Sequence, residues 1–468
     1  MATPPLHERT ASELVALLQA GEVSCREVVL AHLARIDAMN PEVHAITLVL
    51  ADQALAAANA ADAQRRTGAE LPPLFGVPFT VKETFDCVGS PTTQGVPALR
   101  DALPYVDAPI VTRMKAAGAI PLGRTNMSEL GLRVATDNPL RGRTHNPFSR
   151  RLTVGGSSGG DAAAVATQMA PIGLGADMGG SLRIPAFACG VAALKPTTGR
   201  IPLASSLPPH DFGIAAQTML AAGPIARSIA DLRLALQLLA GRDRRDPRSV
   251  DVPLAGPPPE ERRVALVTEL PECELSAAAV GAVRDAGELL TRAGFIVEEA
   301  SPPELVRVGE VWHKLIAFDL ATTLPHMEPI LTPGAFAHAK RLCRAAKLEE
   351  SSVTRLHEER SRLIRAWSGF FAEFSIAIGP TVSAPLWAPD ADLDPESGLA
   401  LLARATRFVL PGNALGLPAL AMPFGVADGL PLGIQIYADL WREDLCLEAA
   451  ELLERGYAAD LKRRTNLG

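Results

Sequence analysis

Apolar side chains recur every three to four positions in the N-terminal part of the chain. Between residues 25 and 40 they fall on one face of a predicted helix, at Val28, Leu30, Leu33 and Ile36. Ser24 precedes this stretch and is expected to cap the helix, because a serine hydroxyl accepts a hydrogen bond from a free N–H group of the first turn. Ser12 is expected to cap a preceding helix that ends at Gly21. This part of the chain is therefore predicted to be a pair of helices.

Short apolar runs bounded by glycine and proline predict buried strands farther along. The stretch LFGVPFTVKETFD, residues 74–86, is one such run and contains a lysine, and residues 171–180 form another. Helical spacing predicts a helix near 50–65, a helix followed by a strand over 108–126, and a helix over 161–170. Strands and helices thus alternate, as in proteins built on a parallel or mixed sheet.

The C-terminal half continues this alternation. The segments RVALVTE and FIVEEAS flank a helix near 276–293, residues 305–375 have a mostly helical pattern, and strands return before a last helix at 443–457. The stretch GPPPEERR, residues 256–263, is the best candidate for a linker or surface crossing. We predict one large α/β/α layered domain over residues 1–468, with a mixed, mostly central twisted sheet covered by helices and a helical insertion at 305–375.

Composition narrows the classes of function. Of the 468 residues, 48% are apolar, 21% are charged and only 4% are aromatic, and the net charge is −7. Without a run of Lys and Arg, and with few aromatic side chains for base stacking, no nucleic-acid partner is expected. No signal-peptide pattern and no 18-residue uncharged apolar stretch occur, so we expect no membrane association and a cytoplasmic location.

The cysteines do not form a ligand pattern. No CxxC pair and no Cys/His group with zinc-like spacing occurs. We expect reduced, mostly buried thiols and no metal site. The six are Cys25, Cys87, Cys189, Cys273, Cys343 and Cys446.

A glycine-rich stretch, TVGGSSGGDAAA at residues 153–164, surrounds Ser157 and Ser158. It could hold a nucleophilic serine, bind a phosphate, or be a flexible turn. The nucleophile elbow of α/β-hydrolases needs a strong preceding strand and a downstream histidine, and neither stands out. A phosphate-binding loop would close with Lys and Ser or Thr, where this chain has Gly160 and Asp161. The loop alone decides nothing.

A lysine in the apolar run PFTVKETF, Lys82, is a second candidate. One interpretation is a lysine at a strand end that reaches the surface. The other is a buried lysine that stays neutral and acts as a base, because desolvation lowers the pKa of an ammonium group.

The third candidate is GADMGGSLRIPA, residues 175–186, in which Ser181 follows two glycines. A plain glycine turn between strand and helix is one interpretation. The other is an oxyanion hole, which requires N–H donors where negative charge develops on a carbonyl oxygen. Asp177 and Arg183 flank the turn and are expected to hold the loop by ion pairing. The candidate donors are the backbone N–H groups of Met178, Gly179, Gly180 and Ser181.

Taken together, GVPFTVKE, GGSSGG and GADMGGSLRIPA resemble the amidase signature family of serine hydrolases, whose motifs occur in this order. The similarity covers nearly the whole chain, with the core motifs at 70–230, and includes ELVALLQAGEVSCREVV, ALKPTTGRI, GPIARSIADL, LPGNALGLPALAMP and GLPLGIQI.

The resemblance implies a Ser–cisSer–Lys triad. In it Ser181 is the nucleophile, and Ser157, on a cis peptide bond from Gly156, connects Ser181 to Lys82. Ser158 would support the loop. The implied reaction is acyl transfer from a small-molecule amide to water through an acyl-enzyme, without a metal or organic cofactor.

The chain departs from the family pattern near the triad. Ala176 and Met178 stand where many members have threonine, Asp161 where serine is common, and Glu83 where aspartate is common. The triad positions themselves are intact. We therefore expect an active enzyme.

Among members of the family, a stand-alone amidase acting on a small carboxamide is favoured, and the same chemistry would serve esters and carbamates. One alternative is the glutaminase A subunit of the tRNA-dependent amidotransferase, which residues 305–375 do not resemble. A noncatalytic binding protein on the same fold is the other, and the intact triad disfavours it. Homodimers are common in the family, so a homodimer is an open expectation.

Substrate identity is not readable from the sequence. Gly131 aligns with a substrate-contacting position of the family. Arg133 and His210 would favour a charged substrate if they face the site. An apolar or aryl acyl group is suggested by Leu130, Leu132, Phe212, Met219 and Leu220, unless these side chains simply belong to the core.

Overall fold

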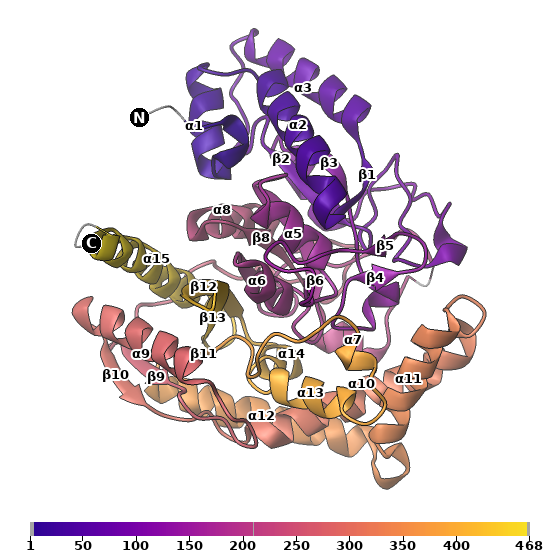
Figure 1. Ribbon diagram of the computed structural model, residues 1–468, viewed down its shortest axis with the longest axis vertical. Helices are drawn as coiled ribbons and strands as arrows, with labels where there is room; N and C mark the ends of the chain where they lie inside the picture. Colours follow the sequence, from indigo (N-terminus) through magenta and orange to yellow (C-terminus); the bar gives the residue numbers. More distant parts are fainter. Residues whose placement is uncertain (1–3, 209, 466–468) are drawn as a thin grey trace.

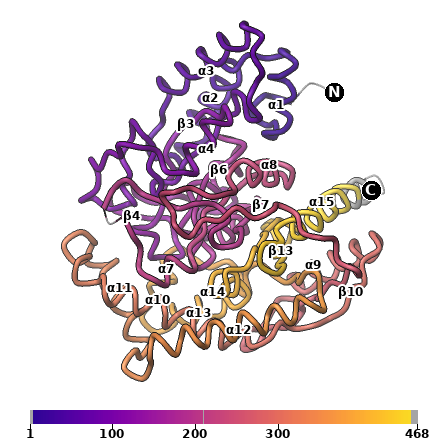
Figure 2. Tube along the Cα trace, turned by 180° about the vertical axis from the view of Figure 1, so that it is seen from behind, coloured from indigo at the N-terminus to yellow at the C-terminus, as the bar shows by residue number. Residues whose placement is uncertain are grey.

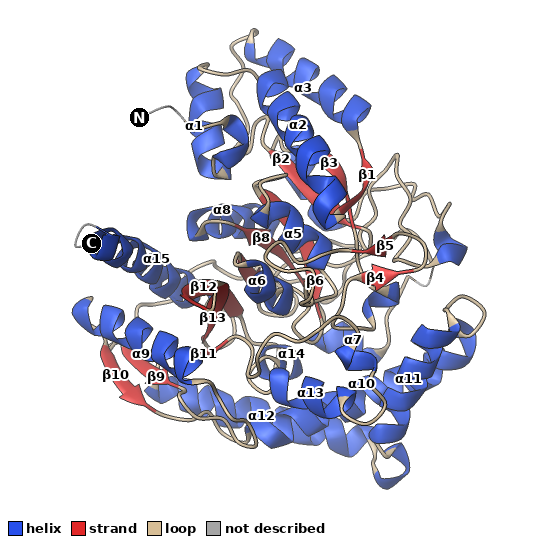
Figure 3. Cartoon of the chain, in the orientation of Figure 1, coloured by secondary structure: helices blue, strands red, loops and turns tan. Residues whose placement is uncertain are grey.

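A mixed sheet of eleven strands runs through the computed structural model, which describes residues 4–208 and 210–465 (Figures 1 and 3). The strand order is β1-β3-β2-β6-β8-β7-β12-β13-β11-β9-β10, and β4 and β5 form a separate two-stranded sheet. The strands are β1 (Ile46–Val49), β2 (Pro78–Lys82), β3 (Ile120–Thr125), β4 (Asp137–Asn138), β5 (Gly142–Arg143), β6 (Ile172–Asp177), β7 (Ala192–Lys195), β8 (Ala221–Ala226), β9 (Arg263–Leu266), β10 (Ile296–Glu299), β11 (Ile376–Pro380), β12 (Ala419–Ala427) and β13 (Leu430–Tyr437).

Helices pack along the whole length of this sheet, so the fold is of the predicted α/β class. Figure 1 shows α1–α3 beside the β1–β3 end and α9 and α12 beside the β9–β10 end. The α-helices are α1 (Ala11–Ala20), α2 (Cys25–Val43), α3 (Ala51–Arg65), α4 (Pro109–Ala116), α5 (Gly159–Ala166), α6 (Arg183–Cys189), α7 (Ile214–Met219), α8 (Ile229–Leu239), α9 (Ala277–Arg292), α10 (Leu305–Met327), α11 (Pro333–Ala345), α12 (Val353–Glu373), α13 (Gly398–Ala405), α14 (Leu410–Ala414) and α15 (Glu443–Thr465).

The direction of two neighbouring strands positions the candidate site. Strands β2 and β6 run parallel and pair Phe79 with Ile172 and Val81 with Leu174. Parallel strands end at the same edge of a sheet, so Lys82 at the end of β2 and Asp177 at the end of β6 lie at one edge. Helix α5 packs on both strands. The glycine loop that precedes α5 is thereby brought to this edge.

The predicted helical segment 305–375 consists of α10, α11 and α12. Its apolar faces pack on the β11–β13 part of the sheet around Trp367, which is fully buried and lies edge-on to Tyr437 at 5.9 Å between ring centroids. Helix α10 also packs against α14 and α7. Seen from behind in Figure 2, α10 and α11 lie beside α7, and α12 runs along the same side of the molecule.

Local predictions from the hydrophobic pattern agree with most of the structure. Ser24 caps α2 in a capping box with Glu27, and Gly21 ends α1 in the left-handed conformation. The predicted cap of α1 is wrong, because Thr10 caps that helix, whereas the Ser12 hydroxyl donates to Asp231 Oδ1 at 2.7 Å.

The six cysteines are free thiols, and four of them are buried, as predicted. Across residues 4–208 and 210–465, no helix has the length and apolar character needed to cross a bilayer.

Candidate active site

Lys82 and Ser157 come together at the edge where β2 and β6 end. The Lys82 side chain is only 1% exposed, and its Nζ lies 2.7 Å from Ser157 Oγ and 2.8 Å from Ser158 Oγ. Of the two interpretations of the sequence, the structure therefore supports a buried lysine and not a lysine that reaches the surface.

Burial lowers the pKa of Lys82 to about 8, because an ammonium group loses hydration in the interior. The carboxylates of Asp161 and Asp177 oppose this shift. No described carboxylate lies within ion-pair distance of Nζ, so the hydroxyls of Ser157 and Ser158 are its side-chain partners. An amine with this pKa is partly neutral near pH 8 and can accept a proton.

Asp161, one of the departures from the family pattern, lies in the first turn of α5, and its carboxylate charge acts on Lys82. Its Oδ1 accepts a hydrogen bond from Thr80 Oγ1 at 3.2 Å, and its Oδ2 is buried without a hydrogen-bond partner. The Thr125 hydroxyl faces the carboxyl group but is also unpaired. Burial raises the pKa of Asp161 to about 7, against the opposing effects of these hydroxyls and of Lys82. The lysine and the carboxyl group are thus both shifted toward their neutral forms.

The glycine loop holds Ser157 in a close approach to a neighbouring backbone. The Gly156–Ser157 peptide bond is cis. A Cβ on Gly156 would lie 2.1 Å from the carbonyl oxygen of Ala135, so only glycine fits there. Gly131 lies close to Ser157, because an added Cβ on Gly131 would meet Ser157 Oγ at 3.2 Å. The loop is therefore packed against residues 131–135.

Backbone and side-chain hydrogen bonds join the two serine-containing loops. The N–H of Ser158 donates to the carbonyl oxygen of Ser181 at 3.1 Å, and the Ser158 hydroxyl lies 3.3 Å from the carbonyl oxygen of Ala176. Ser181 itself is half-buried and follows the end of β6. Ser158 thus contacts the lysine and both ends of the second loop.

Asp177 organises the turn that carries Ser181. Its carboxylate accepts hydrogen bonds from the N–H groups of Gly180 (2.7 Å) and Leu182 (3.1 Å), and it forms a fully buried ion pair with Arg183 at 3.0 Å. Burial alone would raise the pKa of Asp177, but the Arg183 guanidinium holds it well below its ordinary value.

One predicted oxyanion-hole donor is already engaged within the chain. The Gly180 N–H donates to Asp177 Oδ1 at 2.7 Å. Within the described chain, the N–H groups of Gly179 and Ser181 have no acceptor. The carbonyl oxygen of Met178 accepts a hydrogen bond from Trp312 Nε1 on α10 at 2.8 Å.

Distant segments complete the support of Arg183. Its guanidinium donates to Asn413 Oδ1 (2.7 Å), Gln435 Oε1 (2.8 Å) and the carbonyl oxygen of Val409 (2.7 Å). Asn413 also donates to the carbonyl oxygen of Asp177 at 2.9 Å. These residues come from α14, β13 and the segment before α14. Asn413 and Gln435 lie in LPGNALGLPALAMP and GLPLGIQI, two stretches of the family resemblance, but nothing in these stretches indicates that they contact Arg183.

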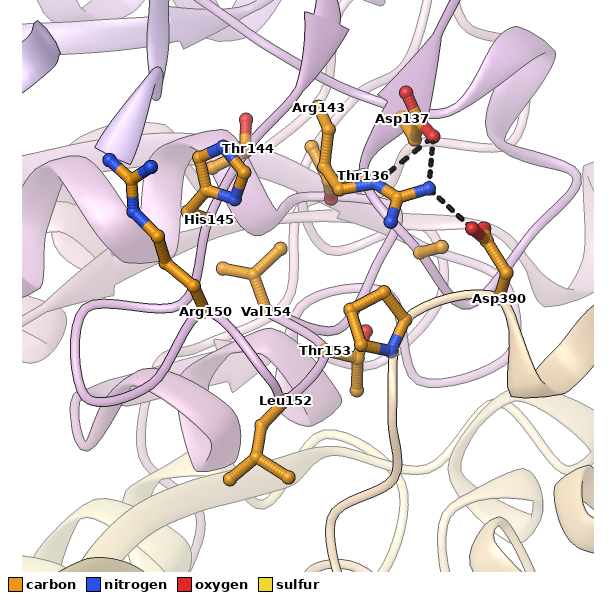
Figure 4. Close-up of a pocket in the computed structure, with 12 residues that line it drawn as sticks. Thr136, Asp137, Arg143, Thr144, His145, Arg150, Leu152, Thr153, Val154 and Asp390 are labelled. Atoms are coloured by element: carbon orange, nitrogen blue, oxygen red, sulfur yellow. Dashed lines mark hydrogen bonds and ion pairs between the residues drawn. The ribbon is translucent and has the colours of Figure 1, made fainter. Parts of the chain in front are cut away.

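Arg133, one of the two residues that would favour a charged substrate, is engaged by carboxylates. Arg133 pairs with Asp390 (2.7 Å) and Asp392 (2.9 Å). Figure 4 shows Arg143 between Asp137 and Asp390, beside a pocket lined by Thr153 and Val154, which lead into the glycine loop. His210 is exposed and makes a long contact of 3.4 Å with the carbonyl oxygen of Ser205.

The apolar residues named from the sequence divide into two groups. Met219 is fully buried in the core around α10 and α12, so it is wrong as a candidate substrate contact, and Leu220 packs against the main core of the sheet. Leu130 and Leu132 are half-buried beside Gly131, and Phe212 is 41% exposed.

Among the described residues, no group of three or more His, Cys, Asp or Glu side chains could hold a metal ion.

Comparison with known proteins assigns the family. The sequence model of the Amidase family matches residues 27–447. The chain is 38% identical over 454 residues to an indoleacetamide hydrolase of Bradyrhizobium diazoefficiens, covering 96% of this chain and 87% of that protein. It is 32% identical over 480 residues to an acylamidase of Rhodococcus erythropolis, covering 97% and 96%.

A solved structure of similar fold is that of a bacterial aryl acylamidase of the amidase signature family, with a TM-score of 0.83, 28% identity and coverage of 97% of both chains. The chain therefore belongs to the amidase signature family. It is a hydrolase that acts on carbon–nitrogen bonds of linear amides.

Proposed function

We propose that Ser181 is the nucleophile of this amidase and that Ser157 and Lys82 relay its proton. As Ser181 Oγ bonds to the amide carbon, its proton passes to Ser157 Oγ and the Ser157 proton passes to neutral Lys82 Nζ. The carbon–nitrogen bond then breaks while the departing nitrogen takes the proton back through Ser157. Water repeats the sequence on the acyl-enzyme and releases the acid. The net reaction converts one amide and one water molecule into one carboxylic acid and one ammonia or amine.

The contact between Lys82 Nζ and Ser157 Oγ, 2.7 Å in a buried environment, carries this proposal. A base must lie within hydrogen-bond reach of the proton that it takes, and its pKa must lie near the working pH. Lys82 meets both conditions, since burial lowers its pKa to about 8. Gly179 and Ser181 supply the unpaired N–H groups that would stabilise the oxyanion.

The pH dependence of kcat/KM should report on Lys82. Activity should rise as the pH increases through about 8, because only the neutral amine accepts a proton. Asp161 raises the pKa of Lys82 by its charge, and Asp177, the other carboxylate that faces Lys82, is neutralised by Arg183. Asp161→Asn removes the first charge, so the rising limb should move to lower pH by about one pH unit.

The matched control is Asp62→Asn, which changes a carboxylate that binds the N–H groups of Cys25 and Arg26 at the start of α2, remote from the site. Its pH profile should overlay that of the wild type. A limb that stays in place or moves to higher pH in Asp161→Asn would contradict the proposed coupling between Asp161 and Lys82.

For the substrate we propose primary amides of arylacetic acids, with indole-3-acetamide as the first candidate. The indoleacetamide hydrolase among the similar proteins supports an aromatic acyl group. The half-buried Met178 supplies apolar surface in the turn that carries Ser181, and Arg133 is paired with two aspartates. A negatively charged acyl group would therefore find no free cation among these residues.

The test is ammonia release from indole-3-acetamide, phenylacetamide, a short aliphatic amide and glutamine under one set of conditions. We expect kcat/KM for the aryl amides to exceed that for the aliphatic amide and for glutamine by about 10-fold or more, since burying an aromatic group contributes a few kcal/mol. Glutamine as the preferred substrate would favour the amidotransferase A subunit instead, to which the chain is 33% identical over 490 residues in Acidothermus cellulolyticus.

A further inference from the structure

Trp312 on α10 contacts the turn that carries Ser181 in two ways. Its indole N–H donates to the carbonyl oxygen of Met178 at 2.8 Å. The ring also lies so close to Gly179 that an added Cβ would meet Cζ2 at 2.7 Å. A residue 134 positions beyond Met178 thus touches the peptide unit between Met178 and Gly179.

That peptide unit has a fixed orientation as a result. In a trans peptide the carbonyl oxygen and the following N–H point in opposite directions. Because Trp312 holds the carbonyl oxygen of Met178, it also sets the direction of the Gly179 N–H. If the unit rotated, the oxygen would turn toward the position that the N–H occupies, and the turn would present an acceptor in place of a donor.

The other side of the turn is held by Asp177. Its carboxylate accepts the N–H groups of Gly180 and Leu182, the alternate members of the series. The N–H groups of Gly179 and Ser181 remain without an acceptor in the described chain. Asp177 does not hydrogen-bond to the Met178–Gly179 unit through its carboxylate, so Trp312 is the side chain that restrains this unit.

Trp312 is itself held in place. Its ring packs edge-on against His313 at 4.9 Å between centroids, and burial lowers the pKa of His313 to about 4, so that this imidazole is neutral at working pH. Helix α10 packs along α14 and α12. Gly179 has no side chain, which allows the indole ring to lie against the backbone.

We propose that Trp312 is a positioning residue for the oxyanion hole: its indole N–H fixes the Met178–Gly179 peptide so that the Gly179 N–H serves as an oxyanion donor. This inference rests on the proposed role of Ser181 as nucleophile. The indole acts through the peptide unit and takes no part in bond making or proton transfer.

Trp312→Phe tests the proposal, because phenylalanine keeps an aromatic ring and loses the N–H donor. Loss of one oxyanion donor costs about 100- to 1,000-fold in kcat, and loss of its restraint should cost less, about 10- to 100-fold. KM should change less than about threefold. Affinity for phenylboronic acid, which forms a tetrahedral adduct with a serine hydroxyl, should fall in parallel with kcat, since only a tetrahedral species uses the hole.

The matched control is Trp367→Phe. Trp367 Nε1 donates to the carbonyl oxygen of Pro303 at 2.9 Å, so the same kind of bond is lost within the core and away from the turn. This variant should lower the melting temperature and leave the ratio of boronate affinity to KM unchanged. A general structural effect of losing an indole N–H would appear in both variants.

Two results would overturn the inference while leaving the proposed function intact. The first is that Trp312→Phe keeps the kcat and the boronate affinity of the wild type. The second is a rise in KM alone, which would show that the indole lines the substrate pocket. Ser181→Ala, assayed in parallel, distinguishes failure of the Trp312 inference from failure of the proposed nucleophile. If that variant kept its activity, the nucleophile assignment would fail and the inference would fail with it.

Discussion

Ser181→Ala should lower kcat for amide hydrolysis by about 10,000-fold or more, because no acyl-enzyme can form without the hydroxyl. The fold should be retained. The Ser181 side chain makes no hydrogen bond within the described chain, and the contact of its carbonyl oxygen with Ser158 does not depend on the side chain. Ammonia release under single-turnover and steady-state conditions measures the loss, and the melting temperature checks the fold.

A second measurement connects this loss to covalent chemistry. A phosphonylating probe should label the wild type at Ser181 and leave Ser181→Ala unlabelled, as read by mass spectrometry of the peptide. Ser276→Ala, which removes the N-terminal cap of α9, is the control and should keep both labelling and activity. Substantial turnover by Ser181→Ala, or labelling at Ser157 in the wild type, would contradict the assignment.

Lys82→Met should lower kcat by about 1,000-fold, within the range that general base catalysis contributes. Methionine has a similar length and suits a buried position, so the substitution removes the amine without opening a large cavity. The remaining activity should also lose the rise with pH near 8 that Lys82 is expected to cause. Rate measurements from pH 6 to pH 10 test both statements.

Lys195→Met provides the matched comparison. Lys195 is fully buried at the end of β7, burial lowers its pKa to about 7, and its Nζ donates to the carbonyl oxygen of Pro196 at 2.7 Å. It is a second desolvated lysine without a hydroxyl partner, and its replacement should preserve the pH profile. Equal losses in the two variants would point to a general requirement for buried lysines and against a relay through Ser157.

The sequence predicts the site at positions where a polar residue interrupts an apolar or glycine-rich stretch. A lysine at the end of an apolar strand and two serines among glycines are local exceptions to the surrounding pattern, and the structure brings Lys82 and Ser157 within hydrogen-bond distance. Parallel pairing of β2 with β6 explains why motifs nearly a hundred residues apart reach one edge of the sheet. The alternation of strands and helices likewise predicted the α/β fold.

Other features depend on which side chain reaches which backbone group, and periodicity carries no such information. The Gly180 N–H looked equivalent to its neighbours in the sequence, yet the Asp177 carboxylate takes it. Trp312 and Asn413 reach the Ser181 turn from helices far along the chain, and nothing near them in sequence marks their partners. The cap of α1 is different, because Thr10 and Glu13 have the spacing of a capping box, so the sequence itself carries the signal for this cap.

The attachment of α10 to the Ser181 turn limits how this enzyme could be re-engineered. The segment from α10 to α12 supplies Trp312, whereas Lys82 and Ser157, the proposed proton relay, belong to β2 and the glycine loop. We expect a chimaera that receives this helical segment from another amidase to keep the Lys82–Ser157 contact, because neither residue belongs to the segment. Its turnover would survive the graft only if the donor segment also brings an N–H group to the oxygen of Met178.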